Sequence, residues 1–412
     1  MGTFAVKHTP YLVIIVILSG VFAAWLPAGL AKLIEYGADI VLAVCSVVYF
    51  IRNKNILLDK YRTIACLYIF LLIYVVAALI KIQFVQSGMF PFYIMRMLTN
   101  FCCFGLIFIF MNEKVVRKTM KLWWKYVPIL FIISFWKLAP SMYIGVLSFV
   151  LVFIIIINCL SKKQKLFTIL AFIFIASKGI IQRIDYIIVL ISILLFLMLH
   201  YKKFLGQRMA ALIFHCQMWI PLIFLVLGLS GTFNVLNFDS YVESDYKSGI
   251  GERFNEDTRT FLYEEAIASA IDNNYVIWGR TPGYGYDSFF EQYHLDLGEK
   301  TALDVKSQMA QRASEVFVVN MFTWCGLLGL VFFFVFYYSI GLSILRQTKN
   351  DYLRMFVLYI GFFWILCFIS HQFFVPSSDY IMLYIIIAIC MNPKLQNVSN
   401  KTIELKLRSL LN

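Results

Sequence analysis

Long apolar runs separated by short polar connections fill almost the whole chain. The runs recur from residue 11 to residue 391, and most are close to the roughly 20 residues that an α-helix needs to cross the hydrocarbon of a bilayer. This pattern predicts an all-α polytopic membrane protein with about twelve transmembrane helices. The predicted spans are 11–27, 33–51, 63–80, 92–111, 122–137, 140–158, 166–178, 180–199, 211–230, 315–345, 353–371 and 377–391.

One long polar segment, residues 231–313, interrupts the pattern between the ninth and tenth spans. A connection of this length without structure of its own is unusual in a compact protein, so we expect it to fold as a cap. Its stretch "DTRTFLYEEAIASAI" (257–271) has apolar residues at helical spacing, with Asp257 as a plausible N-cap, which predicts an amphipathic helix. A glycine-rich turn and a second short helix at about 304–312 are expected to follow.

The chain therefore divides into four parts. Residues 1–230 form transmembrane helices 1–9, residues 231–313 the cap, residues 314–391 transmembrane helices 10–12, and residues 392–412 a tail. The composition, 61% hydrophobic and 14% charged, excludes an ordinary soluble globular protein. Eight of the nine cysteines fall in predicted spans, the ninth, Cys159, directly follows one, and none lies in the cap or shows CxxC spacing, so we expect neither a disulfide in the cap nor a metal centre.

The distribution of charge predicts the orientation. Lys and Arg gather in alternate connections, at 52–62, 114–121, 162–165, 202–208 and 346–354. The positive-inside rule then places both termini in the cytoplasm and the cap outside. The cap has 14 acidic and 7 basic residues, a net charge of −7, whereas the rest of the chain has 29 basic and 9 acidic residues, a net charge of +20.

Among the basic residues on the outer side, where this rule disfavours them, five are candidates for a shared anion site. They are Arg96, Lys178, Arg183, Arg259 and Arg280. A charge at mid-membrane depth costs about 2.5–3.5 kcal/mol on the insertion scale and is a functional-site hypothesis by default. Together these side chains would suit a diphosphate, because a guanidinium binds two oxygens at once. The alternative, that each one reaches the lipid headgroups by snorkelling, stays open.

The stretch "VIWGRTPGYGYDSFF" (276–290) holds three glycines, a proline and Arg280, which we read as unpaired. It lacks the GK[ST] of a nucleotide-binding loop. Successive glycines, here including Gly283 and Gly285, let backbone N–H groups turn toward an anion. The alternative is an ordinary turn between two cap helices, and the motif alone favours that turn.

The order of three outer segments resembles a known family. "TRTFLYEEA", "VIWGRTPGYG" and "SEVFVVNMFTWCGLLGL" are similar to the outer-loop signature of the O-antigen polymerase and O-antigen ligase superfamily. The matching positions are Arg259, Tyr263 and Ala266, then Gly279 to Gly285, then Gly326 to Gly329, with Arg183 in "SKGIIQR" as a displaced arginine. The similarity covers roughly residues 177–330. Where the family has a His-Asn pair, this chain has Glu315 and Val316.

The resemblance implies a metal-independent glycosyltransferase without a cofactor, in a bacterial cytoplasmic (inner) membrane. Its donor and acceptor would be undecaprenyl-diphosphate-linked oligosaccharides, with membrane lipids and a chain-length regulator as further partners and no nucleic acid. The expected diphosphate-binding residues are Arg96, Lys178, Arg183, Arg259, Arg280, Gly283 and Gly285, of which Arg183, Arg259 and Arg280 would stabilise the leaving group. Because this chain lacks the histidine of the family at that position, the resemblance favours a polymerase over a ligase.

Glu315 is the expected general base, and the alternative is a carboxylate that caps the tenth span. Weaker candidates for the base are Glu264, Glu265 and His294. Expected sugar-binding residues are Tyr263, Tyr284, Tyr286 and His294, although aromatic residues are common at membrane interfaces without any ligand.

Two other functions stay open. A ligase would transfer the same glycan to a lipid or surface acceptor, and it differs from a polymerase only in the acceptor. A lipid-linked oligosaccharide flippase has a similar number of helices, but it needs polar residues through the whole bilayer depth. The charges of this chain gather toward the outer side, which favours chemistry there over transport.

Overall fold

The computed structural model describes residues 2–82, 98–139, 141–179, 183–201, 206–230, 260–282, 285–287, 314, 316–369 and 376–411. Within these ranges the chain is helical and forms no β-strand. In chain order the elements are α1 (Gly2–Ile17), α2 (Ser19–Trp25), α3 (Ala28–Lys60), α4 (Arg62–Ile82), α6 (Leu106–Phe110), α7 (Glu113–Ser134), α8 (Ser141–Ile155), η1 (Ile157–Cys159), α9 (Lys162–Phe174), η2 (Ile175–Gly179), α10 (Arg183–His200), α11 (Gln207–Leu229), α12 (Thr260–Asp272), α15 (Phe317–Gln347), α16 (Asp351–Ile369), α17 (Ser378–Cys390), α18 (Pro393–Gln396) and α19 (Asn400–Leu411).

The helices agree with a membrane protein. Each predicted apolar run overlaps a described helix. Five helices are long and apolar enough to cross a bilayer, or up to seven if each of two bent pairs is one span, and three shorter apolar helices accompany them. The all-helical membrane architecture is therefore confirmed, whereas the number of twelve crossings and the outward position of the cap stay predictions.

Several helix boundaries differ from their predictions, because α3 continues to Lys60 and α9 begins at Lys162, inside two predicted connections. The basic residues at 114–121, assigned to a connection, belong to the first turns of α7, which begins at Glu113. The side chain of Asn112 caps this helix by accepting a hydrogen bond from the N–H of Lys114 (3.1 Å). Val116 and Met120 are buried while Arg117 is exposed, so amphipathic spacing extends the helix beyond its purely apolar part.

The centre of the bundle is formed by α16 and α17. Every residue from Tyr380 to Cys390 is buried, and α16 packs against α10, α11, α15 and α17. Peripheral helices instead leave large apolar side chains exposed, such as Ile73 of α4 (60%) and Val226 of α11 (65%). Such continuous apolar exposure is expected of a surface that faces acyl chains rather than water.

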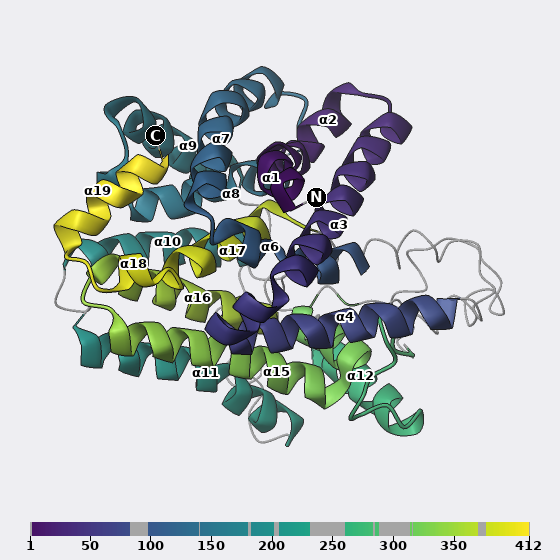
Figure 1. Ribbon diagram of the computed structural model, residues 1–412. Coiled ribbons are helices and arrows are strands. Elements are labelled where there is room, and N and C mark those ends of the chain that lie inside the picture. The colour runs from purple at the N-terminus through teal and green to yellow at the C-terminus, as the bar shows by residue number, and fades with distance from the viewer. Residues whose placement is uncertain are drawn as a thin grey trace, which may run out of the picture.

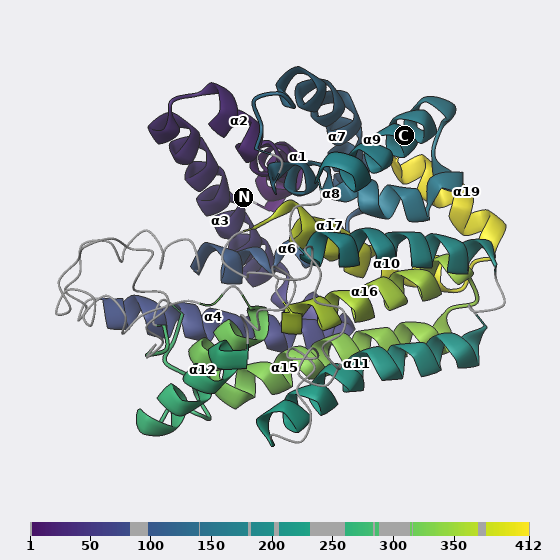
Figure 2. The same cartoon turned by 180° about the vertical axis from the view of Figure 1, so that it is seen from behind.

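In their described residues, four of the five predicted basic connections, 114–121, 162–165, 202–208 and 346–354, lie toward one end of the molecule, which we call the basic end. Hydrogen bonds join the tail to two of them and to η1, the turn that follows α8. Arg117 donates to Ser409 (2.9 Å), Gln164 donates to the carbonyl of Leu411 (3.3 Å), and Arg408 donates to the carbonyl of Asn158 (3.1 Å). In Figures 1 and 2, α18 and α19 lie at this end and α12 at the opposite end, with α4, α11, α15 and α16 running between. Which side of a membrane this end faces stays a prediction.

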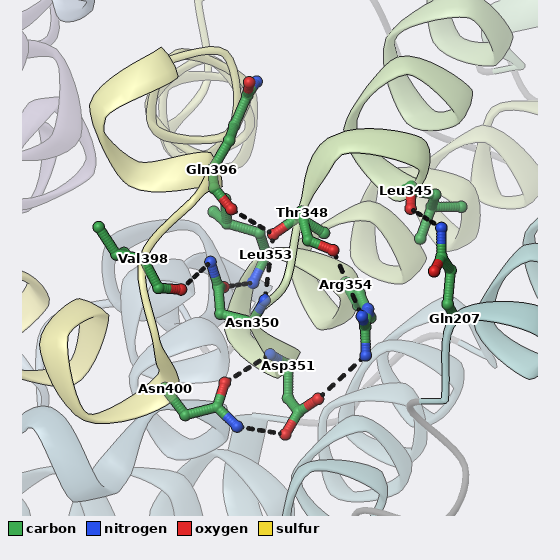
Figure 3. A network of polar contacts seen from close by, with 10 residues as sticks. All are labelled: Gln207, Leu345, Thr348, Asn350, Asp351, Leu353, Arg354, Gln396, Val398 and Asn400. Atoms are coloured by element: carbon green, nitrogen blue, oxygen red, sulfur yellow. Dashed lines mark hydrogen bonds and ion pairs between the residues drawn. The ribbon is translucent and has the colours of Figure 1, made fainter.

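Polar side chains fasten the tail to the turn between α15 and α16 (Figure 3). We call this group, Thr348, Asn350, Asp351, Arg354, Gln396 and Asn400, the basic-end clasp. Asn350, fully buried, donates to the carbonyl of Leu395 (3.0 Å) and accepts from the N–H of Leu353 (2.9 Å). The tail is therefore a packed part of the fold in its described residues.

Candidate functional site

The glycine-rich stretch docks into a break in α15. At Gly326 the backbone leaves the helical conformation (φ 64°, ψ −164°). Four backbone hydrogen bonds cross the break: from the N–H groups of Arg280 and Thr281 to the carbonyls of Thr323 (2.7 Å) and Trp324 (2.9 Å), and from those of Leu327 and Leu328 to the carbonyls of Val276 (2.8 Å) and Ile277 (3.3 Å). Residues 276–281, the strap, thus satisfy the polar groups that the broken helix frees.

Two glycines make this close approach possible. Gly279 and Gly326 both have positive φ (72° and 64°), a conformation that suits residues without a Cβ. A Cβ at Gly279 would collide with the backbone of Trp324 and Cys325, and one at Gly326 with the backbone of Ile277 and Trp278. The Gly-rich stretch and the "GLLG" of the tenth span therefore form one interlocked structure.

Arg280 is not the unpaired cation read from the sequence. Its guanidinium forms a two-pronged ion pair with Asp287, at 2.9 Å to Oδ1 and 2.8 Å to Oδ2, and also donates to the carbonyl of Gly285 (3.0 Å). It lies over the ring of Tyr275, 4.6 Å from the centroid. The partner was missed because Arg280 and Asp287 are joined by a stretch with a proline and two glycines, where no periodicity indicates which side chains meet.

Asp287 is held as a carboxylate by its surroundings. Burial alone would raise its pKa, but the hydrogen bonds and charge of Arg280, with hydrogen bonds from Asn273 and Ser269, outweigh burial and leave the pKa below its ordinary value. Ser269 lies in the last turn of α12, and Asn273 directly follows this helix. The ion pair therefore also fixes α12 to the strap.

Strain is concentrated beside Arg280. Thr281 has φ 83°, which is a genuine outlier for a β-branched residue. Its side chain is 6% exposed, and its hydroxyl has no hydrogen-bond partner in the described part of the chain. Such local strain persists only where the surrounding structure enforces it, and it occurs preferentially at functional sites.

The two described tyrosines of the expected sugar site are packing residues in this structure. Tyr263 is 8% exposed, and its hydroxyl donates to the carbonyl of Phe368 at the end of α16 (2.7 Å). Tyr286 is fully buried. Both therefore contribute to the contact between the cap and the helix bundle.

The start of α15 is fixed by an asparagine that sequence reasoning did not single out. Asn320 accepts from the N–H of Ser314 (2.8 Å) and donates to the carbonyl of the same residue (2.5 Å). The hydroxyl of Ser314 accepts from the N–H of Val316 (3.0 Å). The two neighbours of Glu315 along the chain are thus held against the first turn of α15.

The remaining candidates are only partly described. Arg183 opens α10 and Lys178 lies in η2, but their side chains are outside the described part. Arg96, Arg259, Gly283, Tyr284, His294 and Glu315 lie outside the described residues altogether. Among described residues, no three His, Cys, Asp or Glu side chains gather as metal ligands would.

Comparison of the chain with protein-family models, with curated proteins and with solved structures found no match. A functional assignment therefore has to come from the residues and their geometry.

Proposed function

We propose that this chain is a membrane-embedded glycosyltransferase, a polymerase that transfers a glycan from a polyprenyl diphosphate to the next lipid-linked repeat unit. The reaction takes place at the face of the cytoplasmic membrane opposite the basic end. The observation that carries the proposal is the meeting of the three sequence segments that resemble O-antigen polymerases and ligases.

These segments are distant in sequence but contiguous in space. Tyr263 and Ala266 are buried on α12, which packs against α15. Gly279 lies against Trp324, and Gly326 lies against Ile277. A signature found as an ordered series of fragments is expected to describe one site when the fragments touch, and here they do.

The donor supplies its own chemical energy. When the glycosyl–diphosphate bond breaks, negative charge grows on the leaving diphosphate, and preorganised cations stabilise it without a metal. Arg183, in the first turn of α10, and Arg259, directly before α12, are proposed to do this. Glu315, between Ser314 and Val316, is proposed to accept the proton of the attacking hydroxyl.

Arg280 has a different part in this mechanism. Because the carboxylate of Asp287 already binds its guanidinium, the first task of this side chain is to hold the strap and α12 together.

The test is a reconstitution with purified protein and a polyprenyl-diphosphate-linked repeat unit, without metal or nucleotide. A ladder of lengthened glycans is the expected product. A single transfer to a core lipid would identify a ligase instead, and movement of the intact lipid across the membrane without any new linkage would identify a flippase.

Three variants separate the assigned roles. Arg183→Ala is expected to lower the rate about 10²–10³-fold, whereas Arg208→Ala, an exposed arginine at the basic end, should leave it unchanged. Glu315→Gln keeps a hydrogen-bonding side chain but removes the base, so full activity in this variant would reduce Glu315 to a helix cap. Equal rates for Arg183→Ala and Arg208→Ala would remove Arg183 from the site.

A further inference from the structure

Two large apolar side chains of the strap are exposed although their backbone is fixed. Ile277 is 56% exposed and Trp278 67% exposed. The carbonyl of Ile277 accepts from Leu328, and that of Trp278 accepts from the hydroxyl of Tyr74 on α4 (2.7 Å). These side chains are thus held outward by a rigid backbone.

The contacts of the strap place it beside transmembrane helices. Tyr74 lies well inside α4, which continues with apolar residues to Ile80, about 9 Å further at 1.5 Å per residue. On the other side, the strap pairs with Leu327 and Leu328, ten or more residues after α15 begins at Phe317. The strap therefore lies below the end of α4, level with helix turns that belong to candidate membrane spans.

The surface around these two side chains is apolar and exposed in the same way. Ile73 and Val76 of α4 are 60% and 55% exposed, and Leu327 of α15 is 51% exposed. On helices of this length and composition, such side chains face lipid. Ile277 and Trp278 continue this surface between α4 and α15.

Non-helical backbone at membrane depth is tolerated only where its polar groups are satisfied by protein. The strap and the break at Gly326 meet this condition for each other through their four shared hydrogen bonds. A loop in the water above the bilayer would need no such pairing, because water would form hydrogen bonds with its backbone N–H and C=O groups.

We propose that residues 276–279 form a re-entrant wedge inserted into the leaflet on the α12 side, with Ile277 and Trp278 in contact with phospholipid acyl chains. By the positive-inside rule this is the outer leaflet. The wedge does not depend on the proposed function, because it rests on hydrogen bonds and exposure alone. The partner of this apolar surface is the acyl region of the bilayer.

The test measures the depth of Trp278 in reconstituted full-length protein. A nitroxide is attached to Trp278→Cys, and for comparison to Asp272→Cys at the exposed end of α12, after alanine replaces the two exposed cysteines, Cys66 and Cys216. Collisions of each label with oxygen, which concentrates in lipid, and with a water-soluble nickel complex are then compared. Losing Trp278 costs little packing because its side chain is mostly exposed.

The expected result is a reversal between the two positions, with the label at 278 reached by oxygen and shielded from nickel, and the label at 272 reached by nickel. Nickel access at 278 equal to that at 272 would overturn the wedge. Shielding from both reagents would also overturn it, since a second protein surface would then cover the site. Neither readout depends on enzyme activity, so a failed reconstitution of glycan synthesis leaves this test intact.

Discussion

The two ends of this molecule hold their connections by different means. At the basic end, side-chain amides and hydroxyls do the fastening: Asn350 bridges Leu395 and Leu353, and the hydroxyl of Thr348 donates to the carbonyl of Gln396 (3.2 Å). At the α12 end, backbone pairs with backbone across a broken helix. Around Asn350 ordinary residues supply every contact, whereas the α12 end depends on two glycines with positive φ.

This difference separates contacts that only hold two segments together from contacts that also expose a side chain to the surroundings. In the basic-end clasp the amide of Asn350 has partners at both its nitrogen and its oxygen, and the residue is fully buried. The strap instead holds Trp278 outward and leaves the hydroxyl of Thr281 without a partner among the residues that the structure describes. A structure that retains strain and exposure where a simple turn would suffice is expected to present groups to a ligand or a membrane.

The sharpest way to break the interlock is Gly326→Ala. The conformation of Gly326 is essentially restricted to glycine, and an added Cβ would meet the backbone of Ile277. We expect a destabilisation above about 4 kcal/mol, in the exceptional range for one substitution. Thermal unfolding of the detergent-purified protein measures it.

The matched control is Gly145→Ala in α8, where nothing lies within 4 Å of the added Cβ. Because glycine is unfavourable inside a helix, this variant should be unchanged or more stable by about 0.5–1 kcal/mol. If the two variants unfold alike, the strap does not fill the break in α15.

The basic end is tested by Asn350→Leu. This change leaves the carbonyl of Leu395 and the N–H of Leu353 buried without their partner, and each such group costs about 1–3 kcal/mol, so we expect a loss of about 2–6 kcal/mol. Lys401→Ala, at an exposed position beside the clasp, should change stability by less than about 0.5 kcal/mol. The folded fraction of Asn350→Leu should retain the glycan extension proposed for the wild-type protein, and a selective loss of that activity would contradict the distinction between the two ends.

The sequence predicted what is local and periodic. The amphipathic helix read at 257–271 appears as α12, Thr260–Asp272, because apolar residues at helical spacing need a shared face to bury. The apolar runs became helices for the same reason. A single span was read across 315–345, and the structure shows that its helix is broken at Gly326.

What the sequence could not predict is pairing between distant segments. Arg280 and Thr323 share a hydrogen bond although 43 positions separate them, and no periodicity marks such a pair. The packing of α19, with Ile403 and Leu407 buried, was likewise missed because its polar residues resembled a tail. Of the candidate site, the sequence indicated Arg280, Gly285, Tyr263 and Tyr286, but not the contacts that hold them.

The ion pair of the strap is tested by a double-mutant cycle of Arg280→Ala and Asp287→Ala. Hydrogen bonds to charged groups contribute about 1.5–3 kcal/mol, so we expect a coupling energy in this range between the two sites. Hydrogen exchange of a peptide covering the strap measures it, since the N–H groups of Arg280 and Thr281 are protected by the docking. Additive effects of the two substitutions would show that the pair does not hold the strap.

The smallest expected effect is a dependence on pH that belongs to Asp287 alone. Its pKa is lowered in the folded protein, so its contribution is fully present above the ordinary Asp pKa of about 3.9 and is lost as the pH falls through the lower, folded value. Protection of the strap should therefore be constant from neutral pH to about pH 4 and decline below it. Asp287→Asn, compared at each pH, lacks the titrating group, and the difference in protection between the two proteins should shrink as the solution becomes acidic. A difference in protection that stays constant down to pH 3, or grows there, would mean that Arg280 does not stabilise the carboxylate of Asp287. The Arg280–Asp287 ion pair would then be too weak to help hold the strap in place.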